Sequence, residues 1–478
     1  MAGSGRIDPL RRGNLSLPGT FRGRLGLIVG LGLVVRLAHV LLVSHDNPLS
    51  GDAAGYHLAA NLFADGMGFP EPIRHFFGGI DEVTLGNGSV AVVETPIGHL
   101  EPTAGHPPVW TIVMGTFAFL GATTVGQQQV ISALLGLPAI VLMGLLGRRL
   151  RSERLGLLSA SITATYAFVW INDGLIVSET AAIAAAAASM LAGVSFWQEP
   201  SRRRAMVLGL VGGIAALTRS ELILFLPIVA AVILIRSPLP WRERAVRYGI
   251  CGCVALALCL PWFVRNSLVF DAPVLFSNGA GTVLVQTNCD DTYYGSDIGY
   301  WSLQCGQPAP YGPNGELLDE YERDVVVRER ATDYIAQNRG RLASAVIPAR
   351  IGRMWGLYEP IGQLRRDVHA DRRSFAVSAL GFAQFLLLVP AAVAGAVVVR
   401  RSRGPLLVLL AWVPIATLTA ASAFGNTRYR TAAETSLVIL AAVAIDVFTD
   451  RLQRTRQAVD GRESVNHAVA EQLPGGSS

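Results

Sequence analysis

Long apolar runs alternate with short polar connections along most of the chain. Runs of about 18 or more apolar residues are typical of helices that cross a bilayer. The run at 205–218 is the shortest of the set. The pattern predicts membrane-spanning helices at 25–44, 127–147, 155–172, 175–197, 205–218, 221–236, 246–263, 375–399, 405–423 and 433–448.

Arginine clusters between these runs predict the orientation of the bundle. Cytoplasmic loops of membrane proteins carry an excess of Lys and Arg, so we expect all five clusters and the N-terminus on the cytoplasmic side. A further apolar run at 107–121 would move every later cluster outside if it crossed the bilayer. We therefore expect it to lie on or dip into the outer face. The clusters are Arg148 to Arg151, Arg202 to Arg204, Arg242 to Arg247, Arg400 to Arg403 and Arg451 to Arg456.

The resulting fold class is an all-α polytopic membrane protein of about ten transmembrane helices, or eleven if 107–121 crosses. Two large segments, 45–126 and 264–374, then lie outside the cytoplasm. In the first, Asn87-Gly88 between apolar runs predicts a hairpin within 70–102. The second is expected to end in amphipathic helices around 319–338 and 341–357.

The remaining segments are cytoplasmic tails at both ends. Residues 1–24 form an N-terminal tail ahead of a signal anchor, and 25–450 form the membrane domain. Residues 451–478 form a second tail, which is polar and expected to be disordered beyond about 457. The expected location is the plasma (inner) membrane, with multiple passes.

Composition agrees with a membrane protein and excludes some functions. The 478 residues are 51% hydrophobic, and the net charge of +5 comes largely from the arginine clusters. That charge is therefore topology information, and nucleic acid is not an expected partner. Cys289 and Cys305 lie in the second outer segment, where a disulfide between them is plausible, with two free thiols as the alternative.

Charged residues near apolar runs gather at the outer ends of the predicted spans. Asp52 follows the first span, in front of a stretch from His57 to Phe69 that predicts a short amphipathic helix. Asp52 could simply cap that helix, since Asp is a favoured N-cap residue. Glu179, Arg219, Arg265 with Asn266, and Arg428 with Arg430 occupy comparable positions at later spans.

These charges together suggest a site for a phosphorylated lipid at the outer leaflet. Ionisable residues near a membrane are costly, so they tend to be paired or functional. Arginine is well suited to holding a phosphate, and a neighbouring carboxylate can act as a general base.

These residues resemble the GT-C superfamily of polyprenyl-phosphate-sugar-dependent glycosyltransferases. The similarity is greatest to the protein O-mannosyltransferase-like (glycosyltransferase family 39-like) group, which includes the lipid A aminoarabinose transferase. The motifs that carry the resemblance, in order over about 25–435, are Gly51-Asp52-Ala53-Ala54-Gly55-Tyr56, Gly66-Met67-Gly68-Phe69, His106-Pro107-Pro108, Val177-Ser178-Glu179-Thr180, Leu217-Thr218-Arg219, Pro261-Trp262-Phe263-Val264-Arg265-Asn266 and Arg428-Tyr429-Arg430.

The resemblance implies a membrane glycosyltransferase that moves a sugar from a polyprenyl-phosphate donor to an extracytoplasmic acceptor with inversion. Asp52 would be the general base, and Glu179 would orient Asp52 or the acceptor, or bind a cation. The substrate would be held by Tyr56, His106, Arg219, Arg265, Asn266, Arg428 and Arg430. A divalent cation, Mg²⁺ or Mn²⁺, is left open as a cofactor.

One departure bears on the acceptor. Protein mannosyltransferases carry Asp-Glu at the first-loop position, whereas Ala53 follows Asp52 here, which weakens the case for a protein Ser or Thr acceptor. A cell-envelope glycan, a lipid or a protein stays open. The rival hypotheses are a transporter or flippase for lipid-linked sugars, and a non-catalytic assembly partner. A transporter is expected to place its charges near the midplane and to contain an inverted repeat, and neither feature is apparent.

Overall fold

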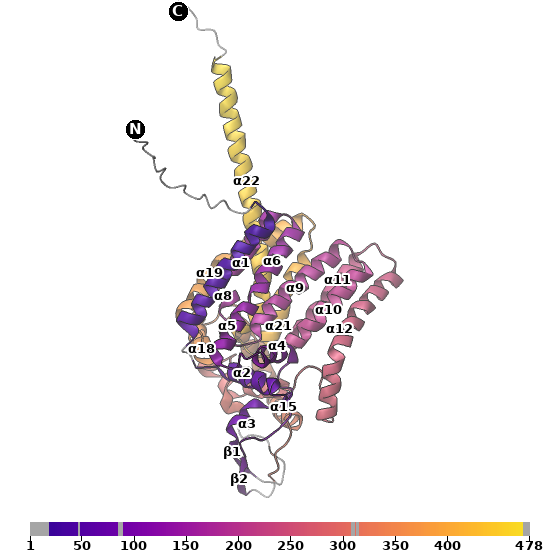
Figure 1. Cartoon of the computed structure of the whole chain (residues 1–478), viewed down its shortest axis with the longest axis vertical. Helices are drawn as coiled ribbons and strands as arrows, with labels where there is room; N and C mark the ends of the chain where they lie inside the picture. The colour runs from indigo at the N-terminus through magenta and orange to yellow at the C-terminus, as the bar shows by residue number, and fades with distance from the viewer. Residues whose placement is uncertain (1–18, 46–47, 85–88, 307–310, 312–314, 472–478) are drawn as a thin grey trace, which may run out of the picture.

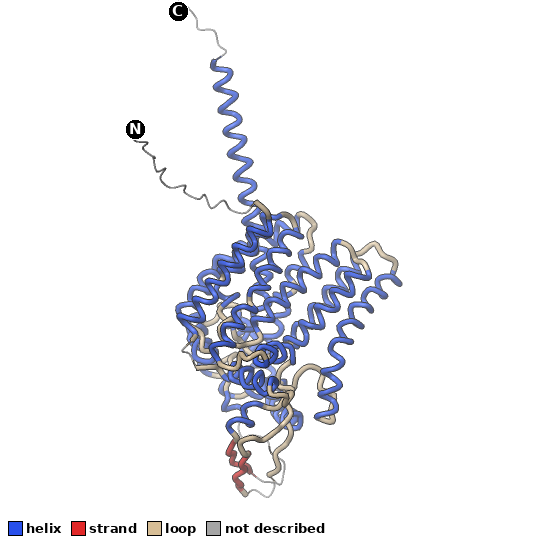
Figure 2. Tube along the Cα trace, viewed as in Figure 1, coloured by secondary structure: helices blue, strands red, loops and turns tan. Residues whose placement is uncertain are grey.

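The computed structural model describes residues 19–45, 48–84, 89–306, 311 and 315–471. Helices dominate, and they pack side by side into a bundle (Figures 1 and 2). The fold class expected from the sequence, an all-α polytopic membrane protein, is confirmed. Every predicted span contains helix: α1 (Phe21–His39), α5 (Val125–Leu135), α6 (Leu137–Leu150), α7 (Glu153–Thr165), α8 (Ala167–Trp170), α9 (Glu179–Gln198), α10 (Arg202–Thr218), α11 (Phe225–Arg236), α12 (Trp241–Val269), α19 (Phe375–Arg401), α20 (Leu406–Leu410), α21 (Trp412–Ser422) and α22 (Thr431–Glu471).

Six helical stretches within the described residues are long and apolar enough to cross a membrane. The other predicted spans fall on shorter helices, so the count of ten crossings stays an expectation. The six stretches are Phe21–Ser44, Val125–Leu150, Glu179–Gln198, Trp241–Val269, Phe375–Arg401 and Thr427–Thr455.

The arginine clusters lie together at one end of the bundle. Arg151, which follows α6, and Arg154 in the first turn of α7 form ion pairs with Asp446 and Asp450 of α22. Arg202 at the start of α10 pairs with Glu243 near the start of α12. We call this end, where α6, α9 and α19 also finish, the basic end. The opposite end carries α2, α15 and the hairpin (Figure 1).

The first outer segment contributes helices and the hairpin to the opposite end. Helices α2 (Gly51–Ala64), α3 (Pro72–Phe77) and α4 (Pro108–Phe119) accompany an antiparallel hairpin of β1 (Gly79–Thr84) and β2 (Val90–Thr95), with Gly79 opposite Thr95. The predicted hairpin is therefore confirmed, although its turn at Asn87-Gly88 lies outside the described residues. Helix α4 packs along α2, and its 12 residues reach only about 18 Å, which is too short to cross a bilayer.

The second outer segment is also helical. It contains α13 (Ala280–Thr287), α14 (Asp290–Tyr293), α15 (Glu320–Gln337), α16 (Arg339–Arg341), α17 (Ile347–Met354) and α18 (Pro360–Asp371). The helices expected around 319–338 and 341–357 are therefore present. Cys289 and Cys305 form a disulfide in this segment.

The core lies where α9 and α22 meet their neighbours. Ala186 and Ala187 of α9 are fully buried, and so is α22 from Val438 to Ala442. Small side chains let helix backbones approach closely, which favours tight packing where no water drives association. A buried ion pair also links α1 to the turn before α9, because Arg36 Nε lies 2.6 Å from Asp173 Oδ2.

Two expectations about helix ends were wrong. Helix α2 begins at Gly51 rather than near His57, and Ser50 is its N-cap, accepting a hydrogen bond from the amide of Ala53. Asp52 therefore sits in the first turn and is not the cap. The tail expected to be disordered beyond 457 continues as α22 to Glu471. Its polar sequence is rich in Arg, Gln, Glu and Ala, which are strong helix formers.

Candidate active site

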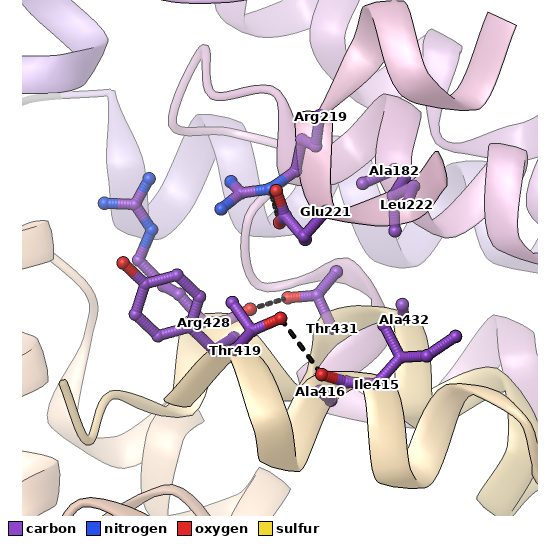
Figure 3. A pocket seen from close by; sticks show the side chains of 11 residues that line it. Ala182, Arg219, Glu221, Leu222, Ile415, Ala416, Thr419, Arg428, Thr431 and Ala432 are labelled. Atoms are coloured by element: carbon purple, nitrogen blue, oxygen red, sulfur yellow. Dashed lines mark hydrogen bonds and ion pairs between the residues drawn. The ribbon is translucent and has the colours of Figure 1, made fainter. Parts of the chain in front are cut away.

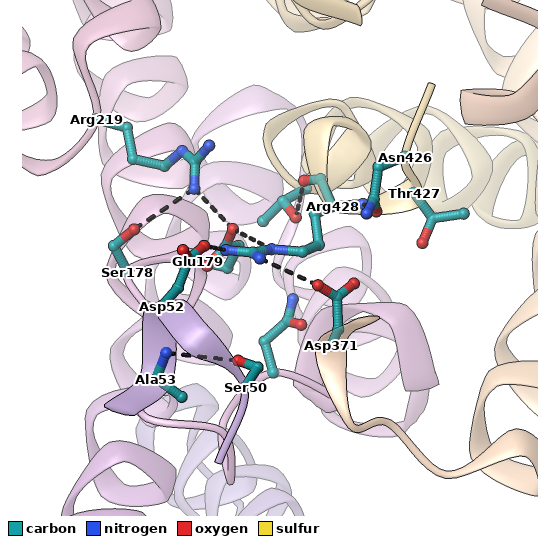
Figure 4. A network of polar contacts seen from close by, with 12 residues as sticks. Ser50, Asp52, Ala53, Ser178, Glu179, Arg219, Asp371, Asn426, Thr427 and Arg428 are labelled. Carbon is teal, nitrogen blue, oxygen red and sulfur yellow. Dashed lines mark hydrogen bonds and ion pairs between the residues drawn. The ribbon is translucent and has the colours of Figure 1, made fainter. Parts of the chain in front are cut away.

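Asp52 belongs to a cluster of charged side chains drawn from separate helices. The first turn of α2 places Asp52 there, and the first residue of α9 supplies Glu179. Arg219 follows the last turn of α10, and Arg428 lies in a short 3-10 turn, 427–430, before α22. Figure 4 shows these side chains pointing toward one another.

Arg428 is the centre of the cluster. Its Nη2 lies 2.9 Å from Asp52 Oδ2, its Nε 2.8 Å from Glu179 Oε1, and its Nη1 3.0 Å from Asp371 Oδ1. Each nitrogen of the guanidinium therefore contacts a carboxylate from a different helix. Asn426 fixes the turn, because its side-chain oxygen accepts a hydrogen bond from the amide of Arg428 at 2.8 Å.

Arg219 extends the cluster on the other side of Glu179. Its Nη1 lies 2.6 Å from Glu179 Oε1, and its Nε lies 2.6 Å from Glu221 Oε1. Its remaining nitrogen, Nη2, makes no hydrogen bond or ion pair within the described part of the chain. Arg219 therefore keeps one donor free beside a buried carboxylate.

The two predicted catalytic carboxylates differ in their exposure to solvent. The Glu179 side chain is completely buried, whereas that of Asp52 is 44% exposed. Loss of solvent is the largest single effect on Asp52 and favours its protonated form. The charges of Arg428 and His106 and the hydrogen bond from Arg428 together outweigh it, so the pKa of Asp52 lies below its ordinary value. Asp52 is thus an ionised carboxylate that a ligand can reach, held against a buried charge network.

Two carboxylate oxygens of the cluster lack hydrogen-bond donors. Glu179 Oε2 and Asp371 Oδ2 are buried and accept no hydrogen bond within the described residues. A buried acceptor without a partner is costly, so these atoms mark places where a hydroxyl or water would be stabilised. Asp371 Oδ2 also lies 3.9 Å from Arg373 Nε, an ion pair without a hydrogen bond.

Tyr56 and His106 form one wall of the site. Their rings stack with centroids 4.7 Å apart, and Tyr56 lies one helical turn beyond Asp52 on α2. His106 is exposed and precedes α4, whereas Tyr56 is buried and hydrogen-bonds Ser178 beside Glu179. Burial raises the pKa of Tyr56, so its hydroxyl keeps its proton.

A small pocket opens beside the cluster. It is lined by Arg219, Glu221, Arg428 and Tyr429 together with Leu222 and residues of α9, α21 and α22 (Figure 3). Its free volume is about 10 Å³, which is room for about one water molecule. A larger ligand could enter only if the surrounding side chains moved.

Three of the predicted substrate-binding residues lie outside the cluster. Arg265 donates hydrogen bonds to the carbonyl oxygens of Thr103 and Phe69, which ties the first outer segment to α12. Asn266 is buried and donates to the carbonyl oxygen of Val274. Arg430 is buried, and its Nε lies 2.5 Å from Glu434 Oε1 while its Nη1 donates to the carbonyl oxygen of Met354. In this structure these three residues support the fold.

Asp371 is a cluster residue that the sequence interpretation missed. It ends α18, four residues before the span at 375–399. Its place in a run of charges, Arg365 to Arg373, made it resemble an ordinary exposed connection. The position of a carboxylate at the outer end of a span was the signal that could have found it, as it found Asp52 and Glu179.

A family model matches part of the chain. Residues 105–264, about a third of the chain, match the family model described as dolichyl-phosphate-mannose-protein mannosyltransferase. No curated protein sequence matches the chain. The resemblance to GT-C glycosyltransferases inferred from the motifs is thereby confirmed.

Among the solved structures with a similar course of the chain are two glycosyltransferase structures. The Archaeoglobus fulgidus oligosaccharyltransferase in the apo form is 14% identical, with a TM-score of 0.48, and the match covers 91% of this chain and 52% of that one. ArnT from Cupriavidus metallidurans bound to undecaprenyl phosphate is 15% identical, with a TM-score of 0.40 and coverage of 88% and 78%. The chain spans about half the length of the oligosaccharyltransferase.

Proposed function

We propose that the protein is a membrane glycosyltransferase that moves a sugar from a polyprenyl-phosphate donor to an extracytoplasmic acceptor. One observation supports this most: an accessible carboxylate, Asp52, lies 2.9 Å from Arg428, which itself contacts the buried Glu179. A base and a phosphate-binding cation are thus already adjacent. The ArnT structure with undecaprenyl phosphate and an oligosaccharyltransferase structure with a dolichol-phosphate agree with such a donor.

The proposed chemistry is a single displacement at the anomeric carbon. Asp52 accepts the proton of the acceptor hydroxyl as the oxygen attacks that carbon from the side opposite the phosphate. The bond between the carbon and the phosphate oxygen breaks, and polyprenyl phosphate leaves with the electron pair. Arg219 and Arg428 stabilise the charge that grows on the phosphate, which is where fixed cations lower a barrier most.

The present contacts suggest how donor binding would activate Asp52. Arg428 now holds the pKa of Asp52 low, and a weakly basic carboxylate is a poor general base. A donor phosphate would draw Arg428 and the free Nη2 of Arg219 toward itself. Asp52 would then lose its partner, and its basicity would rise at the moment when the acceptor is in place.

A divalent cation does not fit the carboxylates as they are arranged. Asp52, Glu179 and Asp371 surround the guanidinium of Arg428, which already occupies the space between them. Among the described residues, the one close group of three potential ligands is Cys289, Asp291 and Cys305, and its cysteines form a disulfide. We therefore derive no step through a metal ion.

The test is sugar transfer by the purified full chain in lipid. The protein would be incubated with a panel of polyprenyl-phosphate sugars and a mixture of envelope acceptors, and released polyprenyl phosphate would be measured. We expect release with one class of sugar, at a rate that depends on acceptor. Donor that crosses the bilayer intact, without release of polyprenyl phosphate, would instead identify a transporter and refute the proposal.

A further inference from the structure

A second cavity lies at the basic end of the bundle, away from the Asp52 cluster. It has a volume of about 400 Å³ and opens between α6, α9 and α10. Cavities that bind small molecules usually occupy about 300–1,000 Å³, so its size suits part of a lipid. It is lined by Leu142, Arg149, Ala188, Leu191, Ala192, Ser195, Arg204, Val207 and Val211.

The cavity exists because α9 presents small side chains where its neighbours present longer ones. Ala188, Ala192 and Ser195 recur along one side of α9, so the surface there is recessed. Leu142 of α6 and Val207 of α10 form the flanks. The result is an apolar groove that runs toward the ends of all three helices.

Two arginines line the cavity near the end of α6 and the start of α10, Arg149 and Arg204, and they differ in their partners. Arg204 is already neutralised, with Nη2 2.7 Å from Glu199 Oε2 and Nη1 donating to the carbonyl oxygen of Ser195 at 2.7 Å. Arg149 is exposed, and its guanidinium makes no hydrogen bond or ion pair with any described residue. An uncompensated positive charge therefore lies at the open end of an apolar groove.

We propose that this groove binds an anionic phospholipid, with the headgroup phosphate on Arg149 and an acyl chain along α9. Basic pockets between membrane helices on the cytoplasmic side are suited to acidic headgroups, and the positive-inside rule places the basic end there. Charge complementarity argues for a lipid phosphate rather than a neutral lipid.

The groove is distinct from the donor site. Ser195 lies 16 residues beyond Glu179 along the same helix, which corresponds to about 24 Å. A phosphate at Arg149 is therefore far too distant to react at Asp52. The bound lipid would be a resident of the opposite leaflet and would stabilise the packing of α6, α9 and α10.

The test is lipid binding to the full chain by native mass spectrometry. Delipidated protein in neutral detergent would be titrated with phosphatidylglycerol and with phosphatidylcholine of the same acyl chains. We expect one phosphatidylglycerol to bind at least tenfold more tightly than phosphatidylcholine. Arg149→Gln should abolish that preference, and Ala188→Leu, which fills the groove, should weaken binding of both lipids.

Arg401→Gln is the matched control, because Arg401 ends α19 at the same end of the bundle and is also exposed without a partner among the described residues. It should leave the preference unchanged. Equal loss in Arg401→Gln and Arg149→Gln would mean that bulk charge attracts the lipid, and the proposal would be wrong. Unchanged binding in a folded Ala188→Leu variant would also overturn it.

Discussion

Arg428 and Arg430 lie two residues apart, and the same substitution should affect sugar transfer at one and stability at the other. Arg428→Lys and Arg430→Lys both keep a positive charge and remove a planar guanidinium. Lysine offers a compact ammonium, which cannot reproduce several fixed donors at once. We expect Arg428→Lys to lose sugar transfer and Arg430→Lys to lose stability.

The expected cost at Arg430 follows from its buried contacts. Arg430 Nη1 donates to the carbonyl oxygen of Met354 at 2.9 Å, and the guanidinium lies 3.9 Å from the ring centroid of Phe385. A lysine can still pair with Glu434 but would leave the Met354 carbonyl without a donor. An unsatisfied buried acceptor costs about 1–3 kcal/mol, so the thermal midpoint should fall.

The expected cost at Arg428 is kinetic. Its three nitrogens contact Asp52, Glu179 and Asp371, and a lysine ammonium cannot reach all three carboxylates from the same backbone position. The loss of one fixed donor to a developing oxyanion typically lowers kcat by about 10²–10³-fold. We expect transfer to fall by that factor.

The assay compares transfer per folded molecule with thermal stability for both variants in the same lipid. Counting folded protein by size-exclusion chromatography separates the two effects. If Arg430→Lys lost transfer per folded molecule as severely as Arg428→Lys, the assignment of Arg430 to a structural role would be refuted. Wild-type transfer by Arg428→Lys would refute the role of Arg428.

Three further predictions follow from individual contacts. Because Arg428 and His106 together outweigh the loss of solvent and lower the pKa of Asp52, the free enzyme keeps this base ionised as pH falls, so kcat/KM should stay level from about pH 8 to pH 5. A loss of kcat/KM centred near pH 6 would contradict this. Arg265→Gln should lower the thermal midpoint, because the carbonyl of Thr103 loses its donor, but should change turnover less than about twofold; a selective loss of turnover would restore Arg265 to the site. Reduction of the bond between Cys289 and Cys305, which closes a loop across 16 positions, should cost about 3 kcal/mol, and an unchanged thermal midpoint with and without reductant would argue against the disulfide.

Hydropathy predicted the positions of the helices well, because the length and composition of an apolar run are properties of a local stretch of chain. The residues at which helices begin and end were harder to predict. Gly51 and Gly55 disfavour a helix by propensity, yet α2 begins at Gly51 because Ser50 caps it and its buried face packs on α4. Tertiary packing of that kind leaves little trace in a local pattern.

The sequence predicted which residues belong to the site only where their position along the chain, at the end of a span, was enough to identify them. Charges at the outer ends of spans identified Asp52, Glu179, Arg219 and Arg428, which the structure brings together. The same criterion could not tell which way a side chain points. Arg430 therefore looked equivalent to Arg428, although Arg430 pairs with Glu434 and Arg428 pairs with Asp52.

The central claim is that Asp52 is the base for sugar transfer, and one matched pair of variants tests it most directly. Asp52→Asn and Asp65→Asn remove the same charge from α2, and Asp65 is an exposed residue at the far end of that helix. Transfer from the active polyprenyl-phosphate sugar should fall by about 10²–10⁴-fold in Asp52→Asn and stay at the wild-type rate in Asp65→Asn. Wild-type transfer by a folded Asp52→Asn variant would contradict the account.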